Sequence, residues 1–492
     1  MSERNFIACD LGAESGRVIL GNLGGGKLTY EEIHRFPTGA SRIGGSLRWN
    51  ILRIFEELKK GLRKVADTGK PVASVSVDSW GVDYVLFNAK QPMLALPHQY
   101  RDSRTDSVYD AAVEMAGAEK IFSETGLQFM SINTLFQLVS EVEENPELLD
   151  LADNFLTIAD YVNYLFSGAV KEEQSLASTT QIYNPVTQDW SKELIEIFGF
   201  PAKIFPEIVP SGTVIGKLLP ELQDETKLPE IDVVATCSHD TGAAVAAVPA
   251  EGDDWAYLSS GTWSLIGVEL PSPLINEDVR AHNFTNEGGF GGTTRFLKNI
   301  VGLWLLQESR RAWINAGNEL DYATIMTMAE ESESFRSLID PRDPRFVAPP
   351  NMPDAIASYC RETGQVVPET PGQIARCVLE SLALLYHGTL GEIEKLTGRT
   401  INRLHIVGGG SQGKLLNQLA ANATGRTVIA GPVEATAIGN ILIQAVALGD
   451  LDSLDALRGV VKASFPIEKY EPQEPAKWQE AIARFQNLKI SS

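Results

Sequence analysis

The sequence predicts a protein built from two mixed α/β domains. A single hydrophobic core rarely extends beyond about 250–300 residues, and this chain has 492, so two domains of similar size are expected. Helical patterns lead into apolar strand patterns along the chain, as in mixed sheets. A strand, a Gly/Ser-containing turn and a second strand occur at 7–20 and again at 256–268, which suggests that the two halves share one plan.

The composition excludes several classes of function. Hydrophobic residues make up 43% and charged residues 22%, as in ordinary globular proteins. The net charge of −22 argues against a general nucleic-acid or anionic-membrane binder, because both require basic patches. Any anionic ligand must therefore be held locally, by backbone N–H groups, a few basic side chains or a metal. The sequence shows no signal-peptide pattern and no bilayer-length apolar run, so we expect a cytoplasmic protein.

The chain opens with two apolar strands around the segment DLGAESGR, residues 10–17. Glycine lets backbone amides approach a phosphate closely, and Ser15 and Arg17 add donors; a plain hairpin turn is the alternative. Asp10 ends a buried strand, where a carboxylate is costly unless it is hydrogen-bonded or near a cation.

A helix is expected over 51–66, followed by a strand at 75–77. Trp80 then belongs either to the core or to an apolar wall for a sugar. The polar side chains of residues 99–104 suit either a solvated loop or hydroxyl recognition. The segment 192–208, a short helix with Pro-bounded loops, is interpreted as an insertion or cap.

The central segment, residues 231–267, combines a strand, the letters SHDT, a run of small residues and a second strand–turn–strand. Asp240 either accepts a proton from a hydroxyl or caps a helix. The small side chains of 242–248 and 435–450 allow two helices to cross closely, as a hinge or simply within a core. The turn at 259–262 is a second candidate for phosphate binding.

The second half predicts helices over 301–313 and 370–395. Between a strand and a helix, Gly408–Gly410 lets a flat group or a phosphate lie against the backbone, although the GxGxxG spacing of a dinucleotide site is missing. A strand leading into a glycine-containing loop also occurs at 75–81 and 404–410, a second sign of the internal repeat.

Nine motifs in order give the whole chain a resemblance to the FGGY carbohydrate kinases, a branch of the actin, sugar-kinase and Hsp70 superfamily. Any one of them is weak, whereas the ordered set is specific. They are DLGAESGRV (10–18), DSWGVD (78–83), YRDSRT (100–105), SHDT (238–241), YLSSGTWSLIG (257–267), TNEGG (285–289), LKNIVGLWLLQ (297–307), LHIVGGGSQ (404–412) and AGPVEATAIGNI (430–441).

The resemblance implies an α/β fold with two RNase H-like (actin-like ATPase) domains, whose mixed β-sheets flank a central cleft. Residues 1–246 are then the mainly sugar-binding domain and 247–455 the mainly ATP-binding domain. Residues 456–492 form a C-terminal tail expected to pack back on the domains.

The resemblance also implies roles for individual residues. Asp240 falls where the family places its catalytic base, and Asp10 is expected to hold Mg²⁺, through water. The ATP-binding residues are expected to be Ala13, Glu14, Ser15, Gly16, Arg17, Thr262, Gln307 and Gly409, and the substrate-binding residues Gly81, His239, Asp240, Thr241 and Asn299.

Within the family, the chain is most similar to the branch that phosphorylates the 1-hydroxyl of L-rhamnulose, with ATP and Mg²⁺. Ala13 stands where relatives often have Thr, and Thr134–Gln137 stands where many have Lys and Trp, which argues against xylulose or glycerol. A kinase for another ketose, fuculose or xylulose, is the alternative, and a non-catalytic actin-like nucleotide switch is a third. Nucleic-acid and membrane partners are not expected, and the protein is expected to be a monomer or a weak homodimer.

Overall fold

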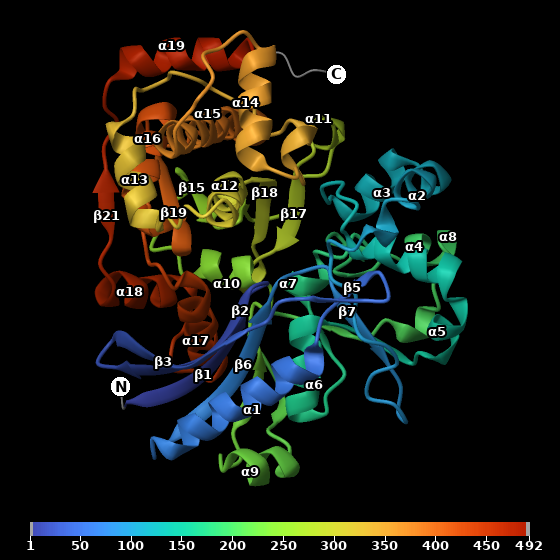
Figure 1. Ribbon diagram of the computed structural model, residues 1–492. Helices are drawn as coiled ribbons and strands as arrows, with labels where there is room; N and C mark the ends of the chain where they lie inside the picture. The colour runs from blue at the N-terminus through green and yellow to red at the C-terminus, as the bar shows by residue number, and fades with distance from the viewer. Residues whose placement is uncertain (1–2, 489–492) are drawn as a thin grey trace. The chain divides into compact units, whose positions relative to one another are not determined.

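The computed structural model describes residues 3–488, which form two compact units (Figure 1). The first unit comprises 3–249, 269–296 and 434–465. The second comprises 250–268, 297–433 and 466–488.

The first unit takes in helix α17 (Ala435–Ala447), which the expected boundaries at 246 and 455 give to the other domain. The reason is a set of buried polar contacts between α17 and the first sheet. Gln444 Nε2 donates to the Ile7 carbonyl at 3.0 Å, and Ser74 Oγ donates to Gln444 Oε1 at 2.6 Å. The division into compact units therefore differs from the sequence boundaries.

The first unit is built on a six-stranded mixed sheet of order β13-β14-β6-β1-β2-β3. β1 is antiparallel to β2 and parallel to β6, and β6 is parallel to β14. The strands are β1 (Arg4–Leu11), β2 (Ser15–Gly24), β3 (Lys27–Pro37), β6 (Val72–Ser79), β13 (Thr213–Lys217) and β14 (Asp232–Ala235).

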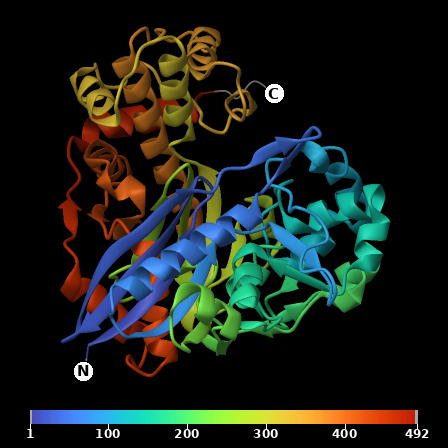
Figure 2. The same cartoon turned by 60° about the horizontal axis from the view of Figure 1, so that its bottom comes forward.

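Helices cover both faces of this sheet because residues alternate between faces along each strand. Apolar residues such as Ile7 and Cys9 pack with α1 (Ile51–Asp67) and α6 (Ile158–Ser167), and Figure 2 shows α1 lying along the strands. The alternate positions, among them Asp10, belong to the face that carries α17 and α10 (Asp240–Ala246). The expected helix over 51–66 is confirmed.

The small residues of α10 and α17 serve a close helix crossing. A Cβ added at Gly439 would overlap the carbonyl oxygen of Ala243, so only glycine fits there. The predicted crossing is confirmed. Both helices belong to the first unit, so the crossing forms part of its core, and a hinge role stays a prediction.

A second hydrophobic cluster in the first unit surrounds Phe136, Phe155 and Trp190 and includes the segment expected to be an insertion. The other elements of this unit are β4 (Ser41–Ile43), β5 (Ser46–Arg48), β7 (Tyr84–Phe87), α2 (Tyr109–Ala116), α3 (Ala118–Thr125), α4 (Thr134–Glu144), α5 (Pro146–Leu151), β8 (Asn154–Thr157), β9 (Glu172–Glu173), α7 (Gln174–Ala177), β10 (Tyr183–Asn184), β11 (Asp189–Trp190), α8 (Lys192–Ile197), β12 (Ile208–Val209), α9 (Pro220–Thr226), α11 (Glu277–Ala281), β17 (Thr285–Gly288) and α18 (Leu454–Ser464).

The sheet of the second unit repeats the plan of the first. β15 is antiparallel to β16 and parallel to β19, as β1 is to β2 and β6, so the internal repeat inferred from the sequence is confirmed. Its neighbouring strands are β18 (Thr294–Val301), β16 (Trp263–Leu270), β15 (Trp255–Ser260), β19 (Arg403–Val407), β20 (Thr427–Ala430) and β21 (Glu468–Tyr470).

The longest helix of the second unit is α15 (Pro371–Thr397), which confirms the helix expected over 370–395. Thr370 and Gln373 form a capping box at its start, and Gly398 ends it in the left-handed conformation. No helix within 3–488 is both long and apolar enough to cross a membrane. The other helices of this unit are α12 (Trp304–Asn315), α13 (Tyr322–Glu331), α14 (Met352–Glu362), α16 (Lys414–Thr424) and α19 (Pro475–Gln486).

Candidate active site

The first unit gathers the predicted residues at one edge of its sheet. β1 and β6 are paired in register, with Asp10 opposite Asp78, and Ser79 N donates to the Ser238 carbonyl at 2.8 Å. The loops that follow β1, β6 and β14 therefore open at the same edge, the usual ligand-binding edge of such sheets. The 12–17 turn, the segment containing Gly81 and the SHDT sequence come together there.

The turn between β1 and β2 is held by backbone contacts. Gly12 N donates to the Ser15 carbonyl at 3.0 Å, and Thr38 binds both sides of the turn, through its N–H to the Glu14 carbonyl and its hydroxyl to the Gly12 carbonyl. Four predicted ATP-binding residues thus lie together, Ala13 and Glu14 in this turn and Ser15 and Gly16 at the start of β2.

Arg17 lies directly after this turn and is already paired with protein carboxylates. Its guanidinium donates to Asp10 through one terminal nitrogen and to Glu434 through the other. Burial on its own would lower the pKa of Arg17, but the two carboxylates raise it, so the side chain stays charged. Glu434 was not singled out from the sequence, because it lies more than 400 residues after Arg17 and no local pattern connects the two.

Asp10 and Asp78 lie in a region with an excess of negative charge. Burial raises the pKa of Asp10 against the effect of Arg17, and Asp240 adds to the rise. Burial also raises the pKa of Asp78 well above its usual range. Asn440 Nδ2 donates to Asp78 Oδ2 at 2.6 Å, while Asp78 Oδ1 is buried without a hydrogen-bond partner among the described residues.

This carboxylate group is suited to Mg²⁺ bound together with phosphates. The described residues contain no cluster of three or more His, Cys, Asp and Glu side chains that forms a metal cage. Mg²⁺ is commonly held by one or two carboxylates, substrate phosphates and water, and does not need such a cage. Asp10 and Asp78 are suited to holding Mg²⁺ in this way. Asp78 is the first residue of the DSWGVD motif, but the sequence did not indicate this role for it.

Asp240 is more open than Asp10 and Asp78, the two other aspartates of this group. It is the first residue of α10, and its side chain is 32% exposed, against 10% for His239. Asp240 Oδ1 accepts from the Thr241 N–H at 2.5 Å and from the Thr241 hydroxyl at 3.2 Å. The N-cap position belongs to His239, so the capping role considered for Asp240 is not the one observed.

The backbone of the SHDT sequence is fixed by a buried acid that sequence reasoning missed. Glu173 accepts from the Ser238 N–H at 2.9 Å and also from the Ser175 hydroxyl, and the Ser175 oxygen in turn accepts from the His239 N–H at 3.0 Å. Glu173 is fully buried, and burial raises its pKa. The loop that carries Asp240 is therefore rigidly attached to β9 and α7.

Gly81 lies where the chain passes close to another segment. A Cβ at Gly81 would be 2.9 Å from Thr179 Oγ1, the same oxygen that accepts from the Val82 N–H at 3.2 Å. Trp80 is 6% exposed and packs on Trp49 with ring centroids 4.1 Å apart, so it belongs to the core.

The loop at 99–104 exposes Arg101 and Ser103 but is held to the rest of the unit by two other side chains. Arg104 is buried and donates to Gln137 at 2.9 Å and to Glu141 at 2.5 Å. Asp102 accepts from the Leu47 N–H at 2.5 Å. These two side chains hold neighbouring elements together.

In the second unit, the turn between β15 and β16 lies against the start of α12. Leu303 N donates to the Gly261 carbonyl at 2.9 Å, and Trp304 N donates to the Thr262 carbonyl at 3.2 Å. The β15–β16 turn is therefore fastened to the N-terminus of α12, the helix that carries Gln307. The predicted ATP residues Thr262 and Gln307 belong to one local assembly.

The glycine-rich loop after β19 lies against the same turn. A Cβ at Gly410 would overlap the Ser260 hydroxyl, whereas a Cβ at Gly409 would meet no atom within 4 Å. The space beside Gly409 is therefore open, and its role in binding a flat group stays a prediction. Asn299, expected among the sugar contacts, lies on β18 within the second unit, whereas the other sugar candidates lie in the first.

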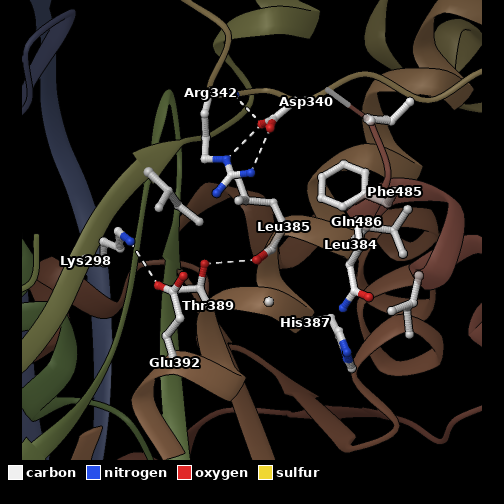
Figure 3. Close-up of a pocket in the computed structure, with 14 residues that line it drawn as sticks. Lys298, Asp340, Arg342, Leu384, Leu385, His387, Thr389, Glu392, Phe485 and Gln486 are labelled. Atoms are coloured by element: carbon white, nitrogen blue, oxygen red, sulfur yellow. Dashed lines mark hydrogen bonds and ion pairs between the residues drawn. The ribbon is translucent and has the colours of Figure 1, made fainter. Parts of the chain in front are cut away.

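A pocket of about 480 Å³ on the second unit contains none of the predicted residues (Figure 3). Its charges are paired internally: Lys298 donates to Glu392 at 2.9 Å, and Arg342 binds Asp340 through two nitrogens at 2.8 and 2.7 Å. Lys298 precedes Asn299 on β18, and neighbouring strand residues point to opposite faces. We therefore do not place the active site in this pocket.

Comparison with solved structures establishes the fold. The chain is similar to the ligand-bound xylulose kinase from Lactobacillus acidophilus, with a TM-score of 0.83, 15% identity and coverage of 99% of this chain and 97% of that one. It is equally similar to the gluconate kinase from Lactobacillus acidophilus, with a TM-score of 0.83, 16% identity and coverage of 99% and 98%. At these identities the likeness establishes the fold alone, which this chain shares with both of these proteins.

Comparison of sequences establishes the family. Residues 5–247 match the N-terminal domain, and residues 256–448 the C-terminal domain, of the FGGY family of carbohydrate kinases. The chain is 44% identical to a rhamnulokinase from Bacteroides thetaiotaomicron, over 99% of each chain, and 39% identical to one from Bacillus subtilis, over 95% of this chain and 96% of the other. The protein belongs to the FGGY family of carbohydrate kinases, which confirms the resemblance inferred from the nine motifs.

Proposed function

We propose that this protein transfers the γ-phosphoryl group of ATP to the 1-hydroxyl of L-rhamnulose, giving L-rhamnulose 1-phosphate and ADP in L-rhamnose catabolism. The observation that carries the proposal is the position of Asp240. Its partly exposed carboxylate is held at the start of α10, at the sheet edge where the 12–17 turn lies.

Asp240 is the proposed base. Phosphoryl transfer requires positioning of the nucleotide, neutralisation of charge on the moving group and an acceptor for the hydroxyl proton. The Thr241 N–H and hydroxyl both bind Asp240 Oδ1 and so fix the orientation of the carboxylate. The carboxylate then takes the proton of the sugar hydroxyl as the new P–O bond forms.

The phosphates are proposed to bind to backbone amides in the 12–17 and 259–262 turns, with Arg17 as a nearby cation. This explains how a chain with a net charge of −22 holds a polyanion. The adenosine is proposed to lie against Gly409 near Gln307. Mg²⁺ neutralises phosphate charge when bound, and Asp10 is proposed to hold it through water, with Asp78 nearby. Residues 1–246 are proposed to contribute most of the sugar site and 247–455 most of the ATP site.

The choice of sugar is supported by the relatives and by one departure from the wider family. Several relatives named rhamnulokinase are 39–44% identical to this chain over nearly its whole length. Thr134 and Gln137, which stand where many FGGY kinases have other residues, both donate to the Val82 carbonyl, at 2.7 and 3.3 Å. The residues that differ from the wider family thus contact Val82, which follows Gly81, and Gly81 is a proposed sugar contact.

The test is a coupled ADP-release assay with L-rhamnulose, L-fuculose, D-xylulose and glycerol. We expect the highest kcat/KM with L-rhamnulose, and a product whose ³¹P–¹H coupling places the phosphate on carbon 1. Preference for another ketose would establish the alternative kinase. An absence of turnover with every acceptor, together with ATP binding, would favour a nucleotide switch and overturn the proposal.

We further infer that the protein acts in the cytoplasm as a monomer or a weak homodimer. The net charge of −22 argues against binding to anionic membranes and so supports the first part of this inference. Cell fractionation and light scattering across a concentration series test the two parts separately.

A further inference from the structure

A buried pair of opposite charges lies directly behind His239, the neighbour of the proposed base. Arg295 at the start of β18 is fully buried, and Glu287 on β17 is 5% exposed. Arg295 Nη1 is 3.1 Å from Glu287 Oε2, and Arg295 Nη2 is 2.9 Å from His239 Nδ1. None of the expected site roles assigned from the sequence includes Glu287 or Arg295.

The contact with Arg295 determines which form of His239 is present. A guanidinium has five N–H donors and no acceptor, so His239 Nδ1 must accept the hydrogen bond. A neutral imidazole that accepts at Nδ1 carries its hydrogen on Nε2. His239 Nε2 lies 3.5 Å from Asp240 Oδ1, so the imidazole presents its donor on the side of Asp240.

Arg295 is itself held in place from several directions. Its Nε donates to the Gly288 carbonyl at 2.9 Å, and Glu287 binds its terminal nitrogen. A Cβ at Gly242 would lie 3.4 Å from Arg295 Cζ and would overlap Cys237 Sγ, so α10 has no side chain where the guanidinium packs. Burial would raise the pKa of Glu287, but the charge of Arg295 brings it below its ordinary value, so the carboxylate is charged.

The charges of Arg295 and Glu287 compensate each other, and His239 is not needed as a counter-ion. Glu287 Oε2 is also 3.3 Å from His239 Nδ1 and would accept a hydrogen from that nitrogen if one were present. The contact from Arg295 Nη2 to His239 Nδ1, at 2.9 Å, is shorter than the one from Glu287. Because the guanidinium carries only donors, a hydrogen on Nδ1 would point at another hydrogen. Arg295 therefore donates to His239 Nδ1, and Glu287 holds Arg295 in place instead of accepting a hydrogen from the imidazole.

We propose that Arg295, held by Glu287, is a positioning residue that keeps His239 as the neutral imidazole with its hydrogen on Nε2. His239 then donates to an acceptor oxygen of the sugar beside the hydroxyl from which Asp240 takes the proton. This inference rests on the proposed kinase function for its consequence, whereas the form of His239 is a property of the free protein. It makes the Arg295–Glu287 pair a determinant of sugar binding.

The form of His239 is measured directly by ¹⁵N NMR of the full-length protein labelled at histidine, with His239→Gln to assign the signals. We expect a pyridine-type Nδ1 and a pyrrole-type Nε2 at pH 7.5, without substrate. A pyrrole-type Nδ1, or a doubly protonated ring, overturns the proposal.

The role of the pair is tested by replacing both members, because removal of one partner would leave an unpaired buried charge. The double variant Glu287→Leu, Arg295→Met fills a similar volume with apolar side chains and leaves no unpaired charge, so it is expected to fold. We expect the histidine signals to lose the single tautomer, and KM for the sugar to rise about 10-fold, the effect of one lost hydrogen bond, with a smaller change in kcat and in KM for ATP.

The matched control is Arg376→Met, Glu380→Leu, which replaces an ion pair of the second unit in which Glu380 is buried and Arg376 is partly buried, with Nε to Oε1 at 2.6 Å. We expect unchanged histidine signals and unchanged KM for the sugar. If the site variant keeps both the tautomer and KM, the proposal is wrong. If the wild type phosphorylates no ketose, the proposed function fails, while the NMR spectra still decide whether Arg295 fixes His239.

Discussion

Asp10 and Arg17 lie directly opposite each other on β1 and β2, and Arg17 joins Asp10 to Glu434. The single guanidinium thus links the first strand to a segment that begins more than 400 residues later. Its two carboxylate partners lie at the edge where the 12–17 turn, the proposed phosphate site, opens.

We expect Arg17→Met to impair both stability and nucleotide binding. The variant leaves the buried Asp10 and the partly buried Glu434 without their cation, at a cost of about 3–5 kcal/mol in the free energy of unfolding. KM for ATP should rise at least about 10-fold. Urea unfolding and steady-state kinetics measure the two effects. Glu434→Gln is the milder control, since Arg17 keeps Asp10; an equal loss in both variants would contradict the linking role of Arg17.

Asp240→Asn tests the proposed base. The amide keeps the size of the side chain but cannot take a proton, so kcat should fall by about 10²–10⁴. Stabilisation by ATP in thermal unfolding should persist, because the phosphate turns are untouched. Turnover within a factor of two of the wild type would show that another group accepts the proton.

Gly439→Ala tests the crossing of α10 and α17. Because the new Cβ would meet the backbone carbonyl of Ala243, we expect a loss of about 1–3 kcal/mol or more in stability. Gly391→Ala is the matched control: Gly391 is also helical, but its added Cβ meets open space, and better helix propensity should stabilise by up to about 1 kcal/mol. Similar losses in both variants would exclude the crossing as the cause.

We expect Asp160 to make the stability of the folded protein depend on pH. Burial, together with the nearby Glu173, raises the pKa of Asp160 to about 8. The folded state therefore binds this proton more tightly than the unfolded state, whose carboxyl titrates near about 4. Its contribution to stability is complete below about pH 4 and is lost as the pH rises toward 8.

The measurement is the free energy of unfolding of wild type and Asp160→Asn at several values between pH 5 and 8. We expect the wild type to lose stability relative to the variant by up to about 1.4 kcal/mol per pH unit in this range. Parallel curves for the two proteins would show that Asp160 does not carry the linkage.

The internal repeat and the two strand–turn–strand hairpins were predictable from the sequence because they depend on local patterns. Alternating apolar residues define β1, β2, β15 and β16, and glycine marks the turns between them. The helices at 51–67 and 371–397 were predictable for the same reason, since apolar periodicity and capping residues are local signals.

The sequence offered less information about Trp80 and the loop at 99–104. For both, it left open a choice between packing and sugar recognition. That choice depends on neighbours such as Trp49, Glu141 and Leu47, which come from other parts of the chain. Periodicity reports that a side chain is apolar or polar, but not which partner it meets.

The sequence by itself determined the fold class, the repeated hairpins and the position of Asp240 among ordered motifs. Only the tertiary structure decided that Arg17 pairs with Glu434, that Glu173 fixes the SHDT backbone, and that Arg295 donates to His239. The physical reason is that buried charges and donors are stable only with partners. Those partners are selected by how distant segments pack together, which no local pattern encodes.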